Sequence, residues 1–167
     1  FTLTAQSASG TTTTNYEGSF AKLALGTPNV FGLAGIQGTT TFKPGVRLNP
    51  VSSAGTWSKG VAANTTLVAN VPRATTADGP FATAQFGLAA VDTDSVGMRT
   101  LNLDTDSPAN GADATLVGSI PLRHGRLRLQ NAIGAANRAL ALPLAAQYWN
   151  GSAFATNDLD SCTRINS

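Results

Sequence analysis

Short stretches of alternating apolar and polar residues, closed by glycine or proline, constrain the fold of this chain more than any other feature. In the first ten residues, FTLTAQSASG, Phe1, Leu3 and Ala5 share one face, while threonine and glutamine occupy the other. Alternation with a period of two is the pattern of a half-buried strand. The 17 glycines and 8 prolines of the 167-residue chain punctuate it often, and helical signals are scarce. The chain therefore favours many short strands.

About ten such strands are expected, with turn residues between them at a spacing of roughly 8–12 residues, which is typical of a sandwich. Asn150-Gly151 lies between AAQYW and SAFAT and is the clearest hairpin signal. We predict an all-β fold, with an immunoglobulin-like β-sandwich in residues 1–120. An additional β-hairpin module in residues 121–167 is a candidate for the start of a second, truncated β domain.

The low charge of the chain indicates an extracellular protein. Only 12% of the residues are charged and 42% are hydrophobic, so uncharged polar residues supply much of the surface. A net charge of +2 gives little attraction for nucleic acid. No apolar run of 18 residues is present, so we expect no direct membrane insertion in this fragment. Because the chain opens within a strand pattern, we expect an export signal upstream of it.

The chain offers little for catalysis. It has a single histidine, His124, and a single cysteine, Cys162. Zinc sites need several such ligands, and no G-x-S-x-G motif accompanies the histidine. We therefore predict no catalytic residues and no enzyme activity. Cys162 cannot form a disulfide within this chain, and whether it pairs with a cysteine beyond residue 167 is left open.

The basic stretch LRHGRLRLQNAIG, residues 122–134, has two interpretations. Arg126 and Arg128 share one face of the expected strand, and the leucines between them share the other. The favoured interpretation is a solvent-facing side, on which the arginines pair with carboxylates or stack on Tyr148 and Trp149. The alternative is a strip that binds a polyanion.

Paired aspartates suggest a calcium site. Asp-x-Asp spacing lets two carboxylates of a tight loop turn toward one ion, although the match to an EF-hand loop is poor. Aspartates also occupy turns for local hydrogen bonding alone. Calcium is thus the one candidate cofactor. The candidate ligands are Asp92, Asp94, Asp104, Asp106 and Asp113.

Three aromatic residues are candidate contacts for a glycan. Trp57, Tyr148 and Trp149 could stack on sugar rings, as aromatic residues do in carbohydrate-binding sandwiches, or they could pack within the protein. Tyr148 and Trp149 point to opposite faces of a regular strand. One of the two should therefore be buried and the other available.

Several long stretches resemble one family. FTLTAQSASGTTTTNYEGSFAKL, DGPFATAQFGLAAVDTDSVG, LRHGRLRLQNAIG and LALPLAAQYWNGSAFATNDLDSCT are similar to the MshQ-like proteins. These are large surface proteins encoded with the mannose-sensitive haemagglutinin (MSHA) type IV pilus machinery, and they share a domain of uncharacterised function. The resemblance spans most of the chain and is weakest in residues 26–76. It implies export to the surface of a Gram-negative bacterium, association with a type IV pilus, and no enzyme activity.

The predicted function is therefore a non-enzymatic structural and adhesive section of an exported cell-surface or type IV pilus-associated protein, with a role in adhesion or MSHA biogenesis. Its expected partners are pilus components, surface glycans or surface proteins. One alternative is a carbohydrate-binding β-sandwich module. Another is a filament subunit or pilus assembly factor that binds other pilus components through exposed edge strands.

Overall fold

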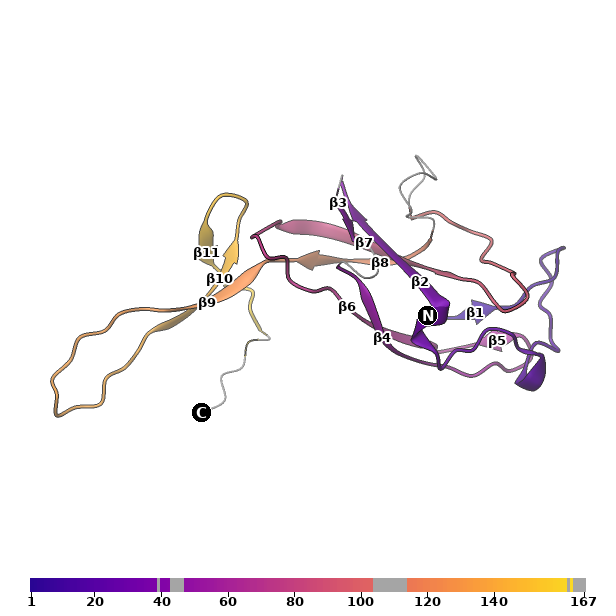
Figure 1. The fold of residues 1–167 in the computed structure, drawn as a ribbon, viewed down its shortest axis with the longest axis horizontal. Helices are drawn as coiled ribbons and strands as arrows, with labels where there is room; N and C mark the ends of the chain where they lie inside the picture. Colours follow the sequence, from indigo (N-terminus) through magenta and orange to yellow (C-terminus); the bar gives the residue numbers. More distant parts are fainter. Residues whose placement is uncertain (39, 43–46, 104–113, 162, 164–167) are drawn as a thin grey trace. The chain divides into compact units, whose positions relative to one another are not determined.

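A computed structural model of the chain describes residues 1–38, 40–42, 47–103, 114–161 and 163. Its regular structure consists almost wholly of strands, which confirms the predicted all-β class (Figure 1). Two short 3-10 turns, η1 (Gly18–Phe20) and η2 (Pro28–Val30), accompany them. The strands are β1 (Leu3–Thr4), β2 (Phe31–Gln37), β3 (Thr40–Phe42), β4 (Asn49–Ala54), β5 (Val61–Ala62), β6 (Thr66–Asn70), β7 (Phe81–Ala90), β8 (Thr115–Leu122), β9 (Gly125–Leu129), β10 (Leu144–Trp149) and β11 (Phe154–Thr156).

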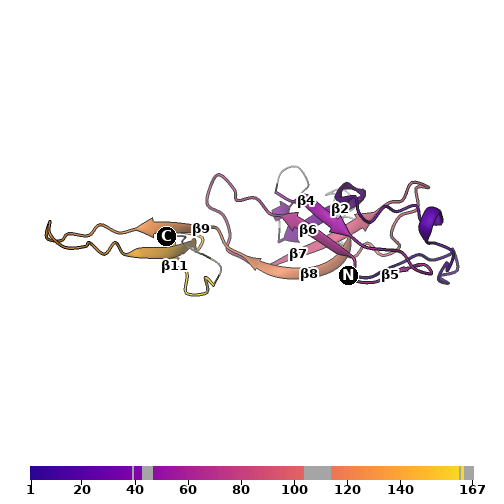
Figure 2. The same cartoon turned by 90° about the horizontal axis from the view of Figure 1, so that it is seen from below.

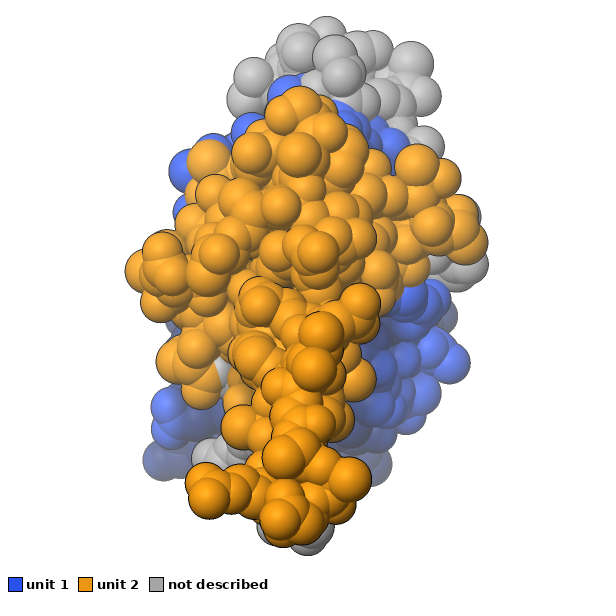
Figure 3. Space-filling view, turned by 90° about the vertical axis from the view of Figure 1, so that its left-hand side faces the viewer, with its two compact units in different colours: residues 1–72, 83–120 blue, residues 73–82, 121–167 orange. Residues whose placement is uncertain are grey.

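The chain divides into two compact units, which Figure 3 shows in different colours. Unit 1 contains residues 1–72 and 83–120, and unit 2 contains residues 73–82 and 121–167. Residues 73–82 lie within the sandwich predicted for residues 1–120, whereas in the structure this segment packs with residues 121–167. Within the described residues, no helix is long and apolar enough to cross a membrane.

Unit 1 is built from two layers of strands (Figure 2). One layer is a four-stranded sheet in the order β3-β2-β7-β8, in which β2 runs antiparallel to both β3 and β7. The other layer contains the two-stranded sheet β4-β6 and the short pair β1-β5. In the β2–β7 register, Phe31 lies opposite Ala90 and Leu33 opposite Leu88.

The core of unit 1 lies between these layers. Because side chains alternate along a strand, Phe31 and Leu33 of β2 face β6, and Ala34 faces the other side of the sheet. Leu67 of β6 packs against the first cluster. The buried members of this main cluster are Leu23, Leu25, Phe31, Ala62, Leu88 and Ala90. A smaller cluster on the other side joins Ala34 to Leu103 and Ala114.

A glycine in β2 makes room for an aromatic pair. Gly35 lies opposite both Phe42 of β3 and Phe86 of β7. The two rings have centroids 5.5 Å apart, and Phe42 is completely buried. A Cβ at Gly35 would lie 2.8 Å from the Phe86 ring, so a side chain at this position would displace it.

Unit 2 is centred on a three-stranded antiparallel sheet in the order β11-β10-β9. The expected hairpin at Asn150-Gly151 joins β10 to β11, with Trp149 opposite Phe154. Of the two turn residues only Gly151 has a positive φ, at 105°. Asn150 contributes through its side chain instead, because its Oδ1 accepts hydrogen bonds from the backbone N–H groups of Ser152 and Ala153.

Candidate binding pocket

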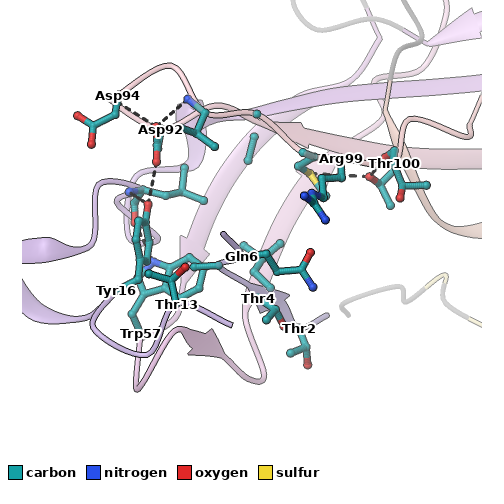
Figure 4. Close-up of a pocket in the computed structure, with 18 residues that line it drawn as sticks. Thr2, Thr4, Gln6, Thr13, Tyr16, Trp57, Asp92, Asp94, Arg99 and Thr100 are labelled. Atoms are coloured by element: carbon teal, nitrogen blue, oxygen red, sulfur yellow. Dashed lines mark hydrogen bonds between the residues drawn. The ribbon is translucent and has the colours of Figure 1, made fainter. Parts of the chain in front are cut away.

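Unit 1 contains a pocket with a volume of ≈ 460 Å³ beside β1. This size lies within the range of small-molecule sites, roughly 300–1,000 Å³. Figure 4 shows Tyr16, Trp57 and Asp92 on one side and Thr2 and Thr4 on the other. The pocket therefore joins segments that are far apart in the sequence.

The aromatic side of the pocket is held by hydrogen bonds to one backbone position. Trp57 Nε1 donates to the Leu23 carbonyl over 3.0 Å, and the Leu23 N–H donates to the Tyr16 hydroxyl over 2.9 Å. The rings of Tyr16 and Trp57 meet edge to face, with centroids 4.9 Å apart. Both polar groups are thus used inside the protein, and the rings themselves line the pocket.

Asp92 connects this aromatic pair to the turn after β7. The Tyr16 hydroxyl donates to Asp92 Oδ2 over 3.1 Å. The other oxygen, Oδ1, accepts from the backbone N–H groups of Asp94 and Val96, each over 2.9 Å. Burial raises the pKa of Tyr16 above its ordinary value, and the neighbouring Asp92 carboxylate raises it further, while backbone hydrogen bonds from Leu23 and Lys22 oppose the shift. Tyr16 is therefore a neutral hydroxyl at physiological pH.

The opposite side of the pocket is polar. Thr2, Thr4 and Gln6 are exposed and line it. Arg99 adds a positive charge, and its guanidinium donates to the backbone carbonyls of Ser7 and Ala8. Within the described part of the chain no carboxylate forms an ion pair with Arg99. This side thus offers hydroxyl and amide groups that both donate and accept hydrogen bonds, together with one unneutralised cation.

Taken together, the two sides suit a ligand with many hydroxyl groups. Aromatic rings bind the apolar faces of sugar rings, while hydroxyl and amide side chains bind their oxygens. Arg99 would favour a ligand that carries a carboxylate or another negative group near this end of the pocket.

The structure distributes the candidate site residues over both units. Trp57, Asp92 and Asp94 lie at the same pocket. Asp104, Asp106, Asp113 and Cys162 lie outside the described residues. Both carboxylate oxygens of Asp92 already accept hydrogen bonds, as aspartate does in a turn. Among the residues that the structure describes, no three His, Cys, Asp or Glu side chains gather as metal ligands do, and the calcium site stays a prediction.

The other two aromatic candidates belong to unit 2 and lie on opposite faces of β10. Tyr148 is covered by Arg123, whose guanidinium carbon is 4.3 Å from the ring centroid. Trp149 packs against Phe154 with ring centroids 5.4 Å apart. Both side chains are half-buried, as Tyr16 and Trp57 are, but neither lines the pocket beside β1.

The basic stretch contributes to the packing of unit 2. Arg126 lies over the Phe154 ring at 3.7 Å and donates to Gln147 Oε1 over 2.9 Å. His124 is 7% exposed, and its Nε2 accepts a hydrogen bond from Arg73 Nε over 2.8 Å. Because Nε2 accepts, the proton of the neutral ring lies on Nδ1, which is 3.4 Å from Asp78 Oδ1. The predicted stacking of arginine on aromatic rings is present. Arg123 stacks on Tyr148, and Arg126 stacks on Phe154 rather than on Trp149.

Sequence reasoning missed most of the polar side of the pocket. The alternation of residues 1–6 placed Thr2, Thr4 and Gln6 on one outward face, which was the one available signal. Nothing in the local sequence connects Tyr16 or Arg99 to this face, because tertiary packing alone brings their segments together.

The fold and the pocket define an all-β protein with two compact units, one of which contains a polar and aromatic pocket. Residues 1–117 match the family described as DUF6701, third domain, and residues 123–167 match DUF6701, fourth domain. The chain belongs to the DUF6701 family. No curated protein and no solved structure matches it.

Proposed function

We propose that this chain is a non-enzymatic, adhesive section of an exported cell-surface protein, in which the pocket of unit 1 binds surface glycans. The observation that carries the proposal is the meeting of Trp57 and Tyr16 with Thr2, Thr4 and Gln6 around one cavity. An aromatic wall opposite hydroxyl and amide groups offers apolar contact to a sugar ring and hydrogen bonds to its hydroxyl groups. The low charge of the chain supports an extracellular site of action.

The resemblance to MshQ-like proteins supports a narrower form of this proposal. It adds association with a type IV pilus and an immunoglobulin-like arrangement of the strands in unit 1. Immunogold labelling of intact cells and sheared pili, with an antibody to this chain, tests the pilus association. Label on pili supports it, and label confined to the periplasm contradicts it.

A glycan array probed with the purified chain tests ligand binding. We expect binding to a limited set of glycans, and Gln6→Ala should weaken it by about tenfold because the variant removes amide hydrogen bonds at an exposed position. Thr4→Ala should also weaken glycan binding, because it removes a hydroxyl group from the pocket. Both side chains are exposed, so neither change should affect folding.

The matched control is Thr41→Ala, which changes an exposed threonine of β3 outside the pocket. It should leave glycan binding unchanged. Absence of any array signal, or binding that survives both pocket variants, would remove the glycan proposal.

A further inference from the structure

One charged side chain of the pocket beside β1 has hydrogen-bond donors that the protein does not use. Arg99 is exposed and lines this pocket. Its Nη2 donates to the backbone carbonyls of Ser7 and Ala8, over 3.3 Å and 2.5 Å. Among the described residues, Nε and Nη1 of Arg99 have no hydrogen-bond acceptor. The N–H groups of these two nitrogens are therefore available to a ligand.

The guanidinium and the backbone of Arg99 are each held by a neighbouring segment. The turn of residues 7–10, in which the Gly10 N–H donates to the Ser7 carbonyl, lies against the guanidinium. Gly10 has a φ of +88°, and a Cβ there would lie 3.1 Å from Arg99 Nη1, so glycine permits this close approach. Beside Arg99, the Thr100 carbonyl accepts a hydrogen bond from the Thr115 hydroxyl. A guanidinium held in this way loses little conformational freedom when it binds a ligand.

The charges of the pocket are separated along its length. Both oxygens of Asp92 already accept hydrogen bonds within the protein. Asp94 is exposed, and Figure 4 shows it beyond Asp92, at the far end of the pocket from Arg99. Because opposite charges attract and like charges repel, a negative group of a ligand is favoured beside Arg99 and disfavoured beside Asp94. The pocket therefore gives an acidic ligand one preferred orientation.

Neutral groups complete the pocket at both ends. Figure 4 shows Trp57 and Tyr16 on the side of the aspartates and Gln6 on the side of Arg99. A negative group beside Arg99 can thus accept hydrogen bonds from the guanidinium and from the Gln6 amide. The pocket volume, ≈ 460 Å³, exceeds that of one hexose ring. One sugar ring can therefore pack on the aromatic side while a neighbouring sugar places its acidic group at Arg99.

We propose that the pocket beside β1 selects acidic glycans, in which a carboxylate or a sulfate group binds Arg99. This inference rests on the glycan-binding function proposed above and adds the chemical class of the sugar. Carboxylate and sulfate share the feature that arginine recognises, which is negatively charged oxygens that accept charge-assisted hydrogen bonds. Arg99 is the only cationic side chain among the described residues that line the pocket, so a single acidic group satisfies it.

A glycan array that contains uronic acid, sialic acid, sulfated and neutral oligosaccharides is the first probe. We expect the glycans that bind most strongly to be acidic. The acidic glycan with the strongest signal is then paired with a neutral form of itself. This form is made by reduction of its carboxyl groups to primary alcohols or by removal of its sulfate groups, and the modification that weakens binding shows which of the two groups is recognised.

Isothermal titration calorimetry compares the two members of the pair. The acidic member should bind wild type about tenfold more tightly than the neutral member, because hydrogen bonds between charged groups are stronger than neutral ones. Arg99→Gln should abolish this preference, so that the two members bind the variant with similar affinity. A merely structural role for Arg99 would instead lower both affinities in parallel and keep the preference.

The matched control is Arg138→Gln, which makes the same change of net charge at an exposed position of unit 2 outside the pocket. It should keep the full preference for the acidic member. Circular dichroism verifies the fold of both variants.

The outcomes separate this inference from the function on which it rests. A wild-type chain that binds both members of the pair equally, or only neutral glycans, would overturn the selection of acidic glycans and leave glycan binding in place. A preference that survives Arg99→Gln would also overturn it. An array without any bound glycan would remove both proposals.

Discussion

Tyr16 connects three segments of unit 1 through its hydroxyl group. The hydroxyl donates to Asp92 and accepts from the Leu23 N–H, while the ring packs on Trp57. A phenolate could not donate, and it would lie beside the Asp92 carboxylate. Burial disfavours the charged phenolate most and is the main reason for the raised pKa of Tyr16, and the hydrogen bond to Asp92 and its negative charge raise this pKa further.

The raised pKa of Tyr16 predicts that the folded protein loses stability at alkaline pH. The pKa of Tyr16 is raised above 10.0 in the folded chain, so its contribution is complete below pH 10 and is lost as the pH rises through the folded value. We expect wild type to melt at a higher temperature than Tyr16→Phe at pH 8, with the difference shrinking above pH 10. Thermal melts of both proteins from pH 8 to 11 measure this difference in melting temperature. A difference that grows with pH would contradict the raised pKa of Tyr16.

At the scale of elements, every residue of β9 is exposed, the arginines as well as the leucines. The arginine side was expected to face solvent and the leucine side the interior. In the structure Arg126 covers Phe154 on the side that carries His124, whereas Leu127 and Leu129 are 51% and 66% exposed. The guanidinium of Arg126 stacks on the Phe154 ring although the residue is exposed, so a charged side chain on the solvent-exposed side of a strand can also contribute to packing.

The sheet of unit 2 should depend on the hydrogen bond between Arg73 and His124. Arg73→Ala would leave the buried His124 Nε2 without its donor, at a cost of about 1–3 kcal/mol. We expect faster hydrogen exchange at the Trp149 amide, which donates to the His124 carbonyl. Arg128→Ala, at an exposed position of β9, is the control and should leave the exchange rate unchanged.

At the scale of the whole molecule, the chain combines few charges with exposed apolar surface in both units. It has 11 Lys and Arg and 9 Asp and Glu, so neither attraction nor repulsion between copies is strong. Contacts between copies would therefore depend on apolar surface and on strand edges.

Local patterns were sufficient to predict the fold class and several individual elements. The alternation in residues 1–6 predicted a strand and the outward face that now lines the pocket, and Asn150-Gly151 predicted the hairpin of unit 2. These predictions depend on backbone sterics and on the period of two in a strand, which act within a few residues. The narrower immunoglobulin-like arrangement is a property of strand order, and it stays a proposal.

Sequence alone determined that this chain forms short strands, because frequent glycine and proline and a period-two pattern leave no other regular structure available. Only the tertiary structure brought Tyr16, Trp57, Asp92 and Arg99 to the N-terminal segment that carries Thr2 and Thr4. It also decided that residues 73–82 pack with His124. The physical reason is that strand pairing joins residues far apart in the chain, and no local pattern specifies which strands will meet.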